Sequence, residues 1–441
     1  MDFRVAIAFI CLYYIRPQDW VPGMAGFNII KPLIAVWVFA LYSRSNQPGS
    51  RPLKLLQTPH DWAMLAYFLY VGLSSAAPVE TLKAFLPSIS FYFLTVLSLD
   101  SREKILTYCK WWNGLMVTVG AFGVLSLYGF DLTGARDMTS KFQGRLALGT
   151  WIHNNPNALG HTVVVALSTS YLLYFWKGTA FQRTVLFPLC VFVAGTCVYE
   201  TQSKGSFLVG AFLILSIFIT GRPKIVKIIV LTLAVSAGVS ALAFLPRMNN
   251  IENVRNEPGV EGRLLAWAEA RIVVKNQPTG EGWKEFQAWI TWEDETQPIA
   301  THSSYVKIGG DLGLYGLFFF STAIWTAIRS LSTLRNTGDI ELERLRRVCL
   351  ILVLSYCLSS WMVNREYHPE YFLMIAVTAA LHRVALLRPV ADRLVTQEDA
   401  DASTETAQPP IWNRFGLIDF AASVGLTYTI LGCWDHVFKN L

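Results

Sequence analysis

The sequence predicts an all-α polytopic membrane protein, and two observations carry that prediction. Of its 441 residues, 53% are hydrophobic and only 15% are charged, whereas a soluble domain usually has about 25% charged residues. The apolar residues also form continuous blocks close to the roughly 20 residues that a helix needs to cross a bilayer. Lipid cannot satisfy the edge amides of an open sheet, and the strands of a membrane β-barrel would alternate between apolar and polar residues.

We predict about twelve membrane spans from these blocks. The first is short, but it has no small-residue cleavage site and runs into Arg16 and Pro17. We therefore expect a retained helix and not a signal peptide. The spans lie near residues 5–15, 27–42, 62–75, 81–99, 105–128, 157–176, 184–199, 206–220, 226–245, 304–331, 348–363 and 370–387.

Lys and Arg in the short loops orient the spans, because cytoplasmic loops carry the excess of these residues. One alternate set of loops holds most of them, for example Arg102, Arg222 and Arg344. We place these loops, and both ends of the twelve-span core, in the cytoplasm. The two long loops, 129–156 and 246–302, then face outside. The net charge of +6 is explained by the inner loops, and we expect no nucleic-acid partner.

The chain divides into three predicted parts. Residues 1–387 form the transmembrane helical domain, which includes the loop 246–302 between spans 9 and 10. Residues 388–413 form a polar cytoplasmic linker whose acidic composition favours disorder. Residues 414–441 form a C-terminal helix around the apolar stretch 415–434, which contains Asp419. This helix either lies flat at the membrane interface or forms an extra span.

No motif for a metal or a nucleotide cofactor is present. The seven cysteines include no CxxC pair, and the seven histidines lack metal-ligand spacing. A P-loop and a dinucleotide fingerprint are also missing. We therefore expect no structural metal and no cofactor, so any energy for a reaction must come with the substrate.

The most informative segment lies where the second long loop meets the next span. His302 brings a titratable imidazole to the membrane surface there, and Asp311 and the glycines Gly309, Gly310, Gly313 and Gly316 follow it. Small residues let membrane helices approach closely. A carboxylate near the end of a span is costly unless it is paired or solvated, so Asp311 either contacts His302 or acceptor sugar or forms a salt bridge that fixes the span.

The loop before His302 is predicted to be folded. A helical pattern at 260–275 carries Arg263 and Trp267, and Pro278 follows its end. The loop also contains three further tryptophans, Trp283, Trp289 and Trp292. Such rings favour anchoring at a membrane interface, and they also suit stacking on sugars.

These residues resemble the signature of the bacterial O-antigen ligase and O-antigen polymerase superfamily. In that family a histidine closes the large periplasmic loop and spaced glycines open the next helix, as His302, Gly313 and Gly316 do here. Gly262 and Arg263, followed by Trp267, are similar to the segment upstream of that histidine. The resemblance covers about residues 115–387.

Two further segments are similar to the same family. Residues 201–205 resemble its short outer Ser-Arg-Gly turn, with Lys204 in place of the usual arginine. Residues 154–160 resemble its asparagine-rich entry to the middle helices. The neighbouring His153 is the main rival to His302, and we interpret it as a polar residue at a helix entry.

The resemblance implies a metal-independent glycosyltransferase of the bacterial inner membrane, with its active site facing the periplasm. The donor is a glycan on a polyprenyl pyrophosphate, and the acceptor is a hydroxyl of lipid A–core or a similar glycolipid or glycan. His302 acts as the base or polarises a phosphate oxygen. Arg263 and Lys204 bind the pyrophosphate; otherwise Arg263 is an exposed helix cation and Lys204 a snorkelling lysine.

Asp311, Arg365 and Arg16 form a second tier of polar or orienting residues. Arg365 and Glu366 are adjacent and also stand as a pair that neutralises itself. We also expect a lateral opening between spans for the lipid tail of the donor.

Four functions share these features. The acceptor distinguishes a ligase from a polymerase that joins repeat units and from a protein oligosaccharyltransferase. An alternative of another class is a transporter of a small anion or of the lipid-linked glycan. Transporters place ionisable groups near the membrane midplane and show repeated halves. Here the notable polar residues lie near the outer surface, which favours the enzyme.

Overall fold

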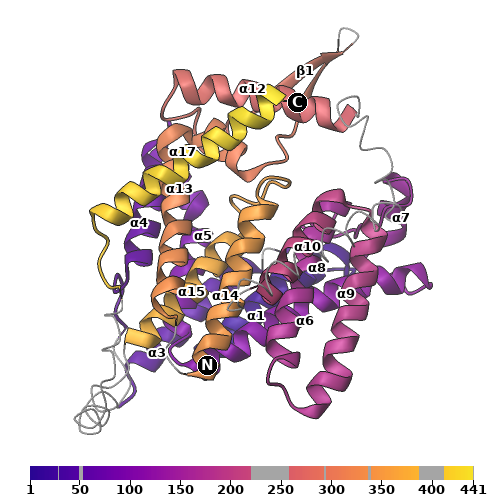
Figure 1. Ribbon diagram of the computed structural model, residues 1–441, viewed down its shortest axis with the longest axis vertical. Helices are drawn as coiled ribbons and strands as arrows, with labels where there is room; N and C mark the ends of the chain where they lie inside the picture. Colours follow the sequence, from indigo (N-terminus) through magenta and orange to yellow (C-terminus); the bar gives the residue numbers. More distant parts are fainter. Residues whose placement is uncertain are drawn as a thin grey trace.

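The protein is a bundle of helices with one small β-hairpin (Figure 1). The computed structural model describes residues 1–27, 29–48, 53–219, 258–292, 295–335, 339–386 and 412–440. Its elements are α1 Asp2–Ile15, α2 Pro17–Trp20, α3 Ile30–Ser45, α4 Pro59–Leu73, α5 Pro78–Ser98, α6 Arg102–Leu127, α7 Ala135–Lys141, α8 Pro156–Ser170, η1 Tyr171–Phe175, η2 Gln182–Leu186, α9 Phe187–Thr201, α10 Lys204–Ile219, α12 Pro258–Asn276, β1 Ala288–Trp292, β2 Glu295–Ile299, α13 Ser304–Thr333, α14 Ile340–Ser359, α15 Pro369–Leu386 and α17 Leu417–Asn440.

Each predicted span that falls within the described residues corresponds to a helix. The span predicted at 226–245 and most of the linker at 388–413 lie outside the described residues. Within the described residues, five helical segments are long and apolar enough to cross a membrane, at 78–98, 156–175, 182–201, 304–333 and 417–436. The mostly helical fold of a membrane protein is therefore confirmed, and the count of twelve spans stays a prediction.

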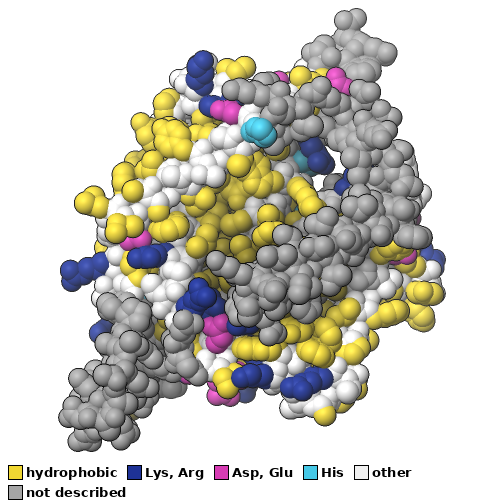
Figure 2. Space-filling view, in the orientation of Figure 1, with side chains coloured by type: hydrophobic (Ala, Val, Ile, Leu, Met, Phe, Trp, Pro, Cys, Tyr) yellow, Lys and Arg dark blue, Asp and Glu magenta, His cyan; other side chains and the backbone are white. Residues whose placement is uncertain are grey.

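The surface agrees with a protein that sits in a membrane. Figure 2 shows hydrophobic side chains over much of the middle of one face, while most of the visible Lys and Arg side chains lie toward its upper and lower ends. Large apolar side chains such as Phe39, Phe192 and Leu208 are more than half exposed. A membrane-facing surface accounts for this exposure, since lipid solvates apolar side chains at no hydrophobic cost.

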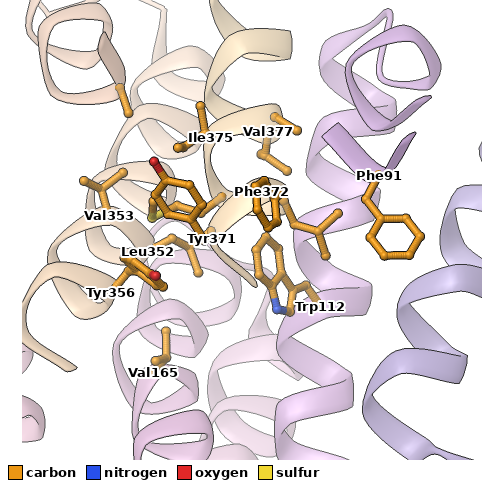
Figure 3. Close-up of a cluster of buried hydrophobic side chains, with 14 of the residues drawn as sticks. Phe91, Trp112, Val165, Leu352, Val353, Tyr356, Tyr371, Phe372, Ile375 and Val377 are labelled. Carbon is orange, nitrogen blue, oxygen red and sulfur yellow. The ribbon is translucent and has the colours of Figure 1, made fainter. Parts of the chain in front are cut away.

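Aromatic rings fill the centre of the bundle where α5, α6, α14 and α15 meet (Figure 3). Tyr371 of α15 stacks on Phe320 of α13, with 4.5 Å between the ring centroids. Phe372 packs against Phe68 and Phe85. Aromatic pairs of this kind contribute about 0.5–1.5 kcal/mol each through packing, and packing is what holds helices together in lipid, so this cluster fixes the relative positions of the helices.

Helix α13 breaks at Gly313, where φ is 66° and ψ is −161°. The turn after α12 fits against this break: the Glu281 N–H donates to the Gly310 carbonyl at 3.1 Å, and the Gly282 N–H donates to the Asp311 carbonyl at 2.7 Å. The Tyr70 hydroxyl donates to the Leu312 carbonyl at 2.9 Å. The break thus leaves α13 carbonyls without helical partners. They accept hydrogen bonds from Tyr70 and from the loop 246–302, which is called the outer loop after its predicted position.

Glycines in α13 and in the turn after α12 allow the outer loop to pack closely against α13. A Cβ at Gly280 would overlap the backbone of Asp311 and Gly313, and a Cβ at Gly313 would overlap the Pro278 carbonyl. Gly310 faces the Phe286 ring in the same way. The predicted close approach therefore occurs, but at these positions its partner is the loop and not a neighbouring membrane helix.

The outer loop itself combines a helix and a hairpin. The helix predicted at 260–275 is α12, and it ends at Asn276 as expected. The antiparallel pairing of β1 with β2, in which Trp289 lies opposite Pro298, was not predicted. The strands are only five residues long, too short for alternation to separate them from a polar loop. Figure 1 shows α12 and the hairpin together at one end of the bundle.

The last helix, α17, runs antiparallel to α13. Trp325 Nε1 donates to Asp419 at 3.2 Å, Ser321 and Thr427 share a hydrogen bond of 2.7 Å, and Trp434 lies against Gly309. A helix that lies flat at the interface would not follow a spanning helix in this way. Of the two predicted alternatives, this packing and the length of the helix favour an extra span.

The far end of α17 reaches the outer loop. The guanidinium of Arg271 in α12 binds the carboxylate of Asp435 through two hydrogen bonds, of 2.6 and 2.9 Å. Trp434, fully buried, packs beside Val274 of α12 at the Gly309 position. Helix α12 is therefore fastened to α17 as well as to α13.

Gly313→Ala and Gly280→Ala should each lower the melting temperature of the purified protein by several degrees. Both positions have positive φ and no room for a Cβ, so a methyl group adds strain and overlap of at least about 2 kcal/mol. Gly114→Ala in α6 is the control, because nothing lies within 4 Å of its added Cβ. Equal melting temperatures for all three variants would contradict this account.

Reversing the charges at positions 271 and 435 should show that the Arg271–Asp435 ion pair holds α12 in place. Asp435→Arg places like charges together and should increase amide hydrogen exchange in α12, whereas Asp435→Arg combined with Arg271→Asp should restore protection. Both side chains are about one-third exposed, so the pair is expected to contribute about 0.5–1 kcal/mol. Unchanged exchange in the single variant would show that the ion pair does not hold the helix.

Candidate functional site

His302 lies in the turn that leads into α13, and its backbone is strained. Its φ of 49° is in the left-handed region, which costs a residue with a side chain about 1 kcal/mol or more. Such strain persists only where the surroundings enforce it, and it is frequent at functional sites.

Hydrogen bonds on both sides of His302 enforce this turn. The Ser304 N–H and the Ser303 hydroxyl both donate to the Ser360 carbonyl, at 2.7 and 3.0 Å. The Ser304 hydroxyl donates to the Val363 carbonyl at 2.9 Å. On the other side, the Thr301 hydroxyl donates to Asn364 at 2.9 Å. The loop between α14 and α15 therefore holds the histidine in place.

Helix α12 places Arg263 beside His302. One turn after Arg263, the Trp267 indole donates to the Thr301 carbonyl at 2.8 Å and is buried. Trp267 therefore supports the histidine turn, and it is not an exposed interfacial anchor. Burial, followed by the positive charge of Arg263, lowers the pKa of His302 to about 4. At neutral pH the imidazole is accordingly uncharged and able to accept a proton.

Lys204 stands at the start of α10, which packs against α8. A Cβ on the next residue, Gly205, would lie 2.9 Å from Nε2 of His161 in α8. Arg263 interacts electrostatically with His161 as well as with His302. The structure thus brings the start of α10, Arg263 and His302 into one region, with His161 among them.

A cavity of about 50 Å³ lies beside His161. One part of its wall is polar and includes His161, Ser359 and Arg365, and another is apolar and includes Trp112 and Met116. Arg263, Lys204 and His302 are not among the residues that line it.

Arg365 is buried and joins two elements. Its guanidinium binds the Glu370 carboxylate, the Ala158 carbonyl at 2.6 Å and the Thr162 hydroxyl at 2.7 Å. Its acidic partner is therefore Glu370, and the alternative of a self-neutralising pair with Glu366 is wrong because Glu370 occupies the guanidinium. Burial raises the pKa of Glu366 to about 8. Arg365 fixes the loop that holds His302 to α8, which is an orienting position.

Asp311 is fully buried and anchors the outer loop. Its carboxylate accepts from Lys307 Nζ and from the Phe286 N–H, both at 3.0 Å, and from the Tyr367 hydroxyl at 2.8 Å. These contacts match the salt-bridge alternative from the sequence, in which Asp311 fixes the span.

Arg16 also has a clear set of contacts. Its guanidinium binds Asp19 through two hydrogen bonds, of 2.5 and 3.0 Å, and lies over the Trp151 ring at 5.1 Å. The rival histidine, His153, is fully buried and shares a hydrogen bond of 3.3 Å with Thr150. Burial lowers its pKa well below the ordinary value, as expected for a structural residue at a helix entry.

Sequence reasoning missed His161 and Glu370. Both are ionisable residues at or within apolar segments, and such residues are costly in a membrane and tend to be functional. That signal was available for His161, which lies in the predicted span 157–176. Among the residues that the structure describes, no group of three or more His, Cys, Asp or Glu side chains has the geometry of a metal site.

Comparison with known proteins identifies a family. Residues 189–321 match the family model described as O-antigen ligase, whereas a search of curated proteins found no match. The matched segment covers less than half of the chain, and it contains Lys204, Arg263, His302 and Asp311. Together with the helical fold and the folded loop before His302, this match supports membership of the O-antigen ligase superfamily.

Proposed function

We propose that the protein transfers a glycan from a polyprenyl-pyrophosphate donor to a hydroxyl of lipid A–core or a similar acceptor, on the periplasmic face of the inner membrane. The observation that carries this proposal is the pairing of a neutral, strained His302 with the cationic Arg263. A base beside a phosphate-binding cation is what attack on a glycosyl pyrophosphate requires.

The reaction exchanges one bond for another at the anomeric carbon. The acceptor oxygen forms a bond to that carbon, and the bond to the pyrophosphate oxygen breaks. The leaving polyprenyl pyrophosphate takes the electron pair, and His302 takes the acceptor proton. Arg263 binds the pyrophosphate through its planar donors, and Lys204 at the start of α10 contributes a point charge. We expect these cations to neutralise the leaving group without a metal.

Donor binding also adjusts the base. A pKa of about 4 leaves His302 neutral but makes it a weak base, since the best catalytic pKa lies near the working pH. Arg263 is the charged neighbour that lowers this pKa. A bound pyrophosphate offsets the charge of Arg263, so the pKa of His302 rises when the donor is in place. The site is therefore a stronger base with donor bound than without it.

Purified protein with polyprenyl-pyrophosphate glycan and lipid A–core should produce glycosylated lipid A–core. His302→Ala should lower kcat by about 10²–10⁴-fold, the usual contribution of a general base. His153→Ala is the control, because that histidine lies outside the site. Lengthened lipid-linked chains would instead indicate the polymerase, and full activity of His302→Ala would remove the base assignment.

The pH profiles of the two kinetic constants should differ. The acidic limb of kcat/KM reports the free enzyme and should lie near pH 4, whereas that of kcat reports the donor complex and should lie at higher pH. Arg263→Gln removes the charge that lowers the pKa of His302, so it should move the kcat/KM limb upward. Identical limbs for kcat and kcat/KM in the unaltered enzyme would contradict activation by the donor.

A further inference from the structure

His161 is the buried ionisable residue of the site that the proposed function leaves without a role. Its side chain is 2% exposed and comes from α8. Nδ1 shares a hydrogen bond of 2.9 Å with the Ser359 hydroxyl of α14. Nε2 is buried and has no hydrogen-bond partner among the described residues. A buried polar atom without a partner is unfavourable, and a ligand that hydrogen-bonds to it would remove this cost.

The surroundings of Nε2 are positively polarised on two sides. Gly205, the second residue of α10, faces it, and a Cβ at that position would be 2.9 Å away. The first turn of a helix carries a partial positive charge, and in α10 the Ser206 N–H donates to the Ser203 hydroxyl at 3.3 Å. Arg263 interacts electrostatically with the same imidazole, as does Arg365. Arg365 is bound to Glu370, and we take Arg263 and the α10 turn as the groups that share an anion with His161.

His382 shows that a partnerless Nε2 is not enough to define a site. Its Nδ1 shares a hydrogen bond of 2.8 Å with Ser330, and its Nε2 is also buried and without a partner in the described structure. Its ring neighbours are His60 and Trp412. His161 differs because it lines a cavity together with Ser359 and Arg365, and because it lies near Arg263 and the start of a 16-residue helix.

We propose that His161 is a further phosphate-binding residue, which donates its Nε2–H to an oxygen of a pyrophosphate held between Arg263 and the first turn of α10. Ser359 donates its hydroxyl proton to Nδ1, so the ring proton stays on Nε2. The ligand chemistry is a pyrophosphate group, either free or as a polyprenyl ester. This inference rests on the proposed function and extends its donor site to a second imidazole from the membrane bundle.

The role assigned to His161 is binding, and that of His302 is proton transfer. The two imidazoles come from different elements: His161 lies in α8 and is held by α14, whereas His302 lies in the outer loop turn. A pyrophosphate between them would join the bundle to the loop through Arg263. The orphaned Nε2 would then become satisfied only when the donor is bound.

Pyrophosphate binding tests this proposal without any need for turnover. The detergent-purified protein is titrated with inorganic pyrophosphate and, separately, with polyprenyl pyrophosphate, and binding is read from the shift in melting temperature. His161→Leu should weaken binding about tenfold or more, the effect expected for loss of a hydrogen bond to a charged group. The matched control His382→Leu should bind as the unaltered protein does.

Two conservative variants make the test independent of folding losses. His161→Gln places its amide N–H near the Nε2 position and should keep most of the affinity, whereas His161→Asn reaches only the Nδ1 position and should lose it. In transfer assays, His161→Leu should raise the donor KM with little change in kcat.

The outcomes separate the two proposals. Unchanged pyrophosphate affinity in His161→Leu and His161→Asn, with glycan transfer intact in the unaltered protein, would overturn the role of His161 alone. Failure of the unaltered protein to bind either pyrophosphate would overturn the proposed function together with this inference. Binding of the polyprenyl ester but not of inorganic pyrophosphate, with the same loss in His161→Leu, supports a site for the lipid headgroup.

Discussion

The position of His302 depends on the hydrogen bonds between residues 301–304 and the loop between α14 and α15. Ser303 and Ser304 both reach the Ser360 carbonyl, and Arg365 ties the same loop to α8. Without these bonds nothing would hold His302 at a positive φ. The loop therefore transmits the position of the membrane helices to an imidazole that lies outside them.

Buried cations lie close to the histidines of the site, and they determine the electrostatic environment of the two imidazoles. Arg263 affects both His302 and His161, and the first turn of α10 adds its partial charge. Such a group of positive charges is unfavourable by itself, since like charges in a region of low dielectric repel one another. An anionic substrate relieves this repulsion, so binding and the readiness of the base are linked through one interaction.

The sequence predicted the helices well, because long apolar blocks are the strongest signal in a membrane protein. It also predicted α12, since Pro278 and the apolar stripe mark that helix clearly. The pairing of Arg365 with Glu370, the contact of Asp311 with Tyr367, and the hairpin were not predicted. The Tyr367 contact joins residues 56 positions apart in the chain, the choice of Glu370 over Glu366 depends on the path of the loop, and the strands are too short for alternation to identify them. A salt bridge of Asp311 was among the predicted alternatives, and Lys307 is its i,i+4 partner. Likewise, His161 gained its meaning only from Gly205 and Arg263, which the fold brings beside it.

The fastening of α12 has a consequence for how a substrate enters. In α12, Trp267 donates to the Thr301 carbonyl and Arg271, one turn later, binds Asp435 of α17, and the turn that follows the helix fits against Gly313. Because α12 is attached at these three points, it resists moving away from the bundle in the way that a hinged lid would. Entry and exit of the substrate are then expected to follow a sideways route from the lipid phase. Exchange of a long-chain donor would accordingly be sensitive to bilayer thickness and fluidity.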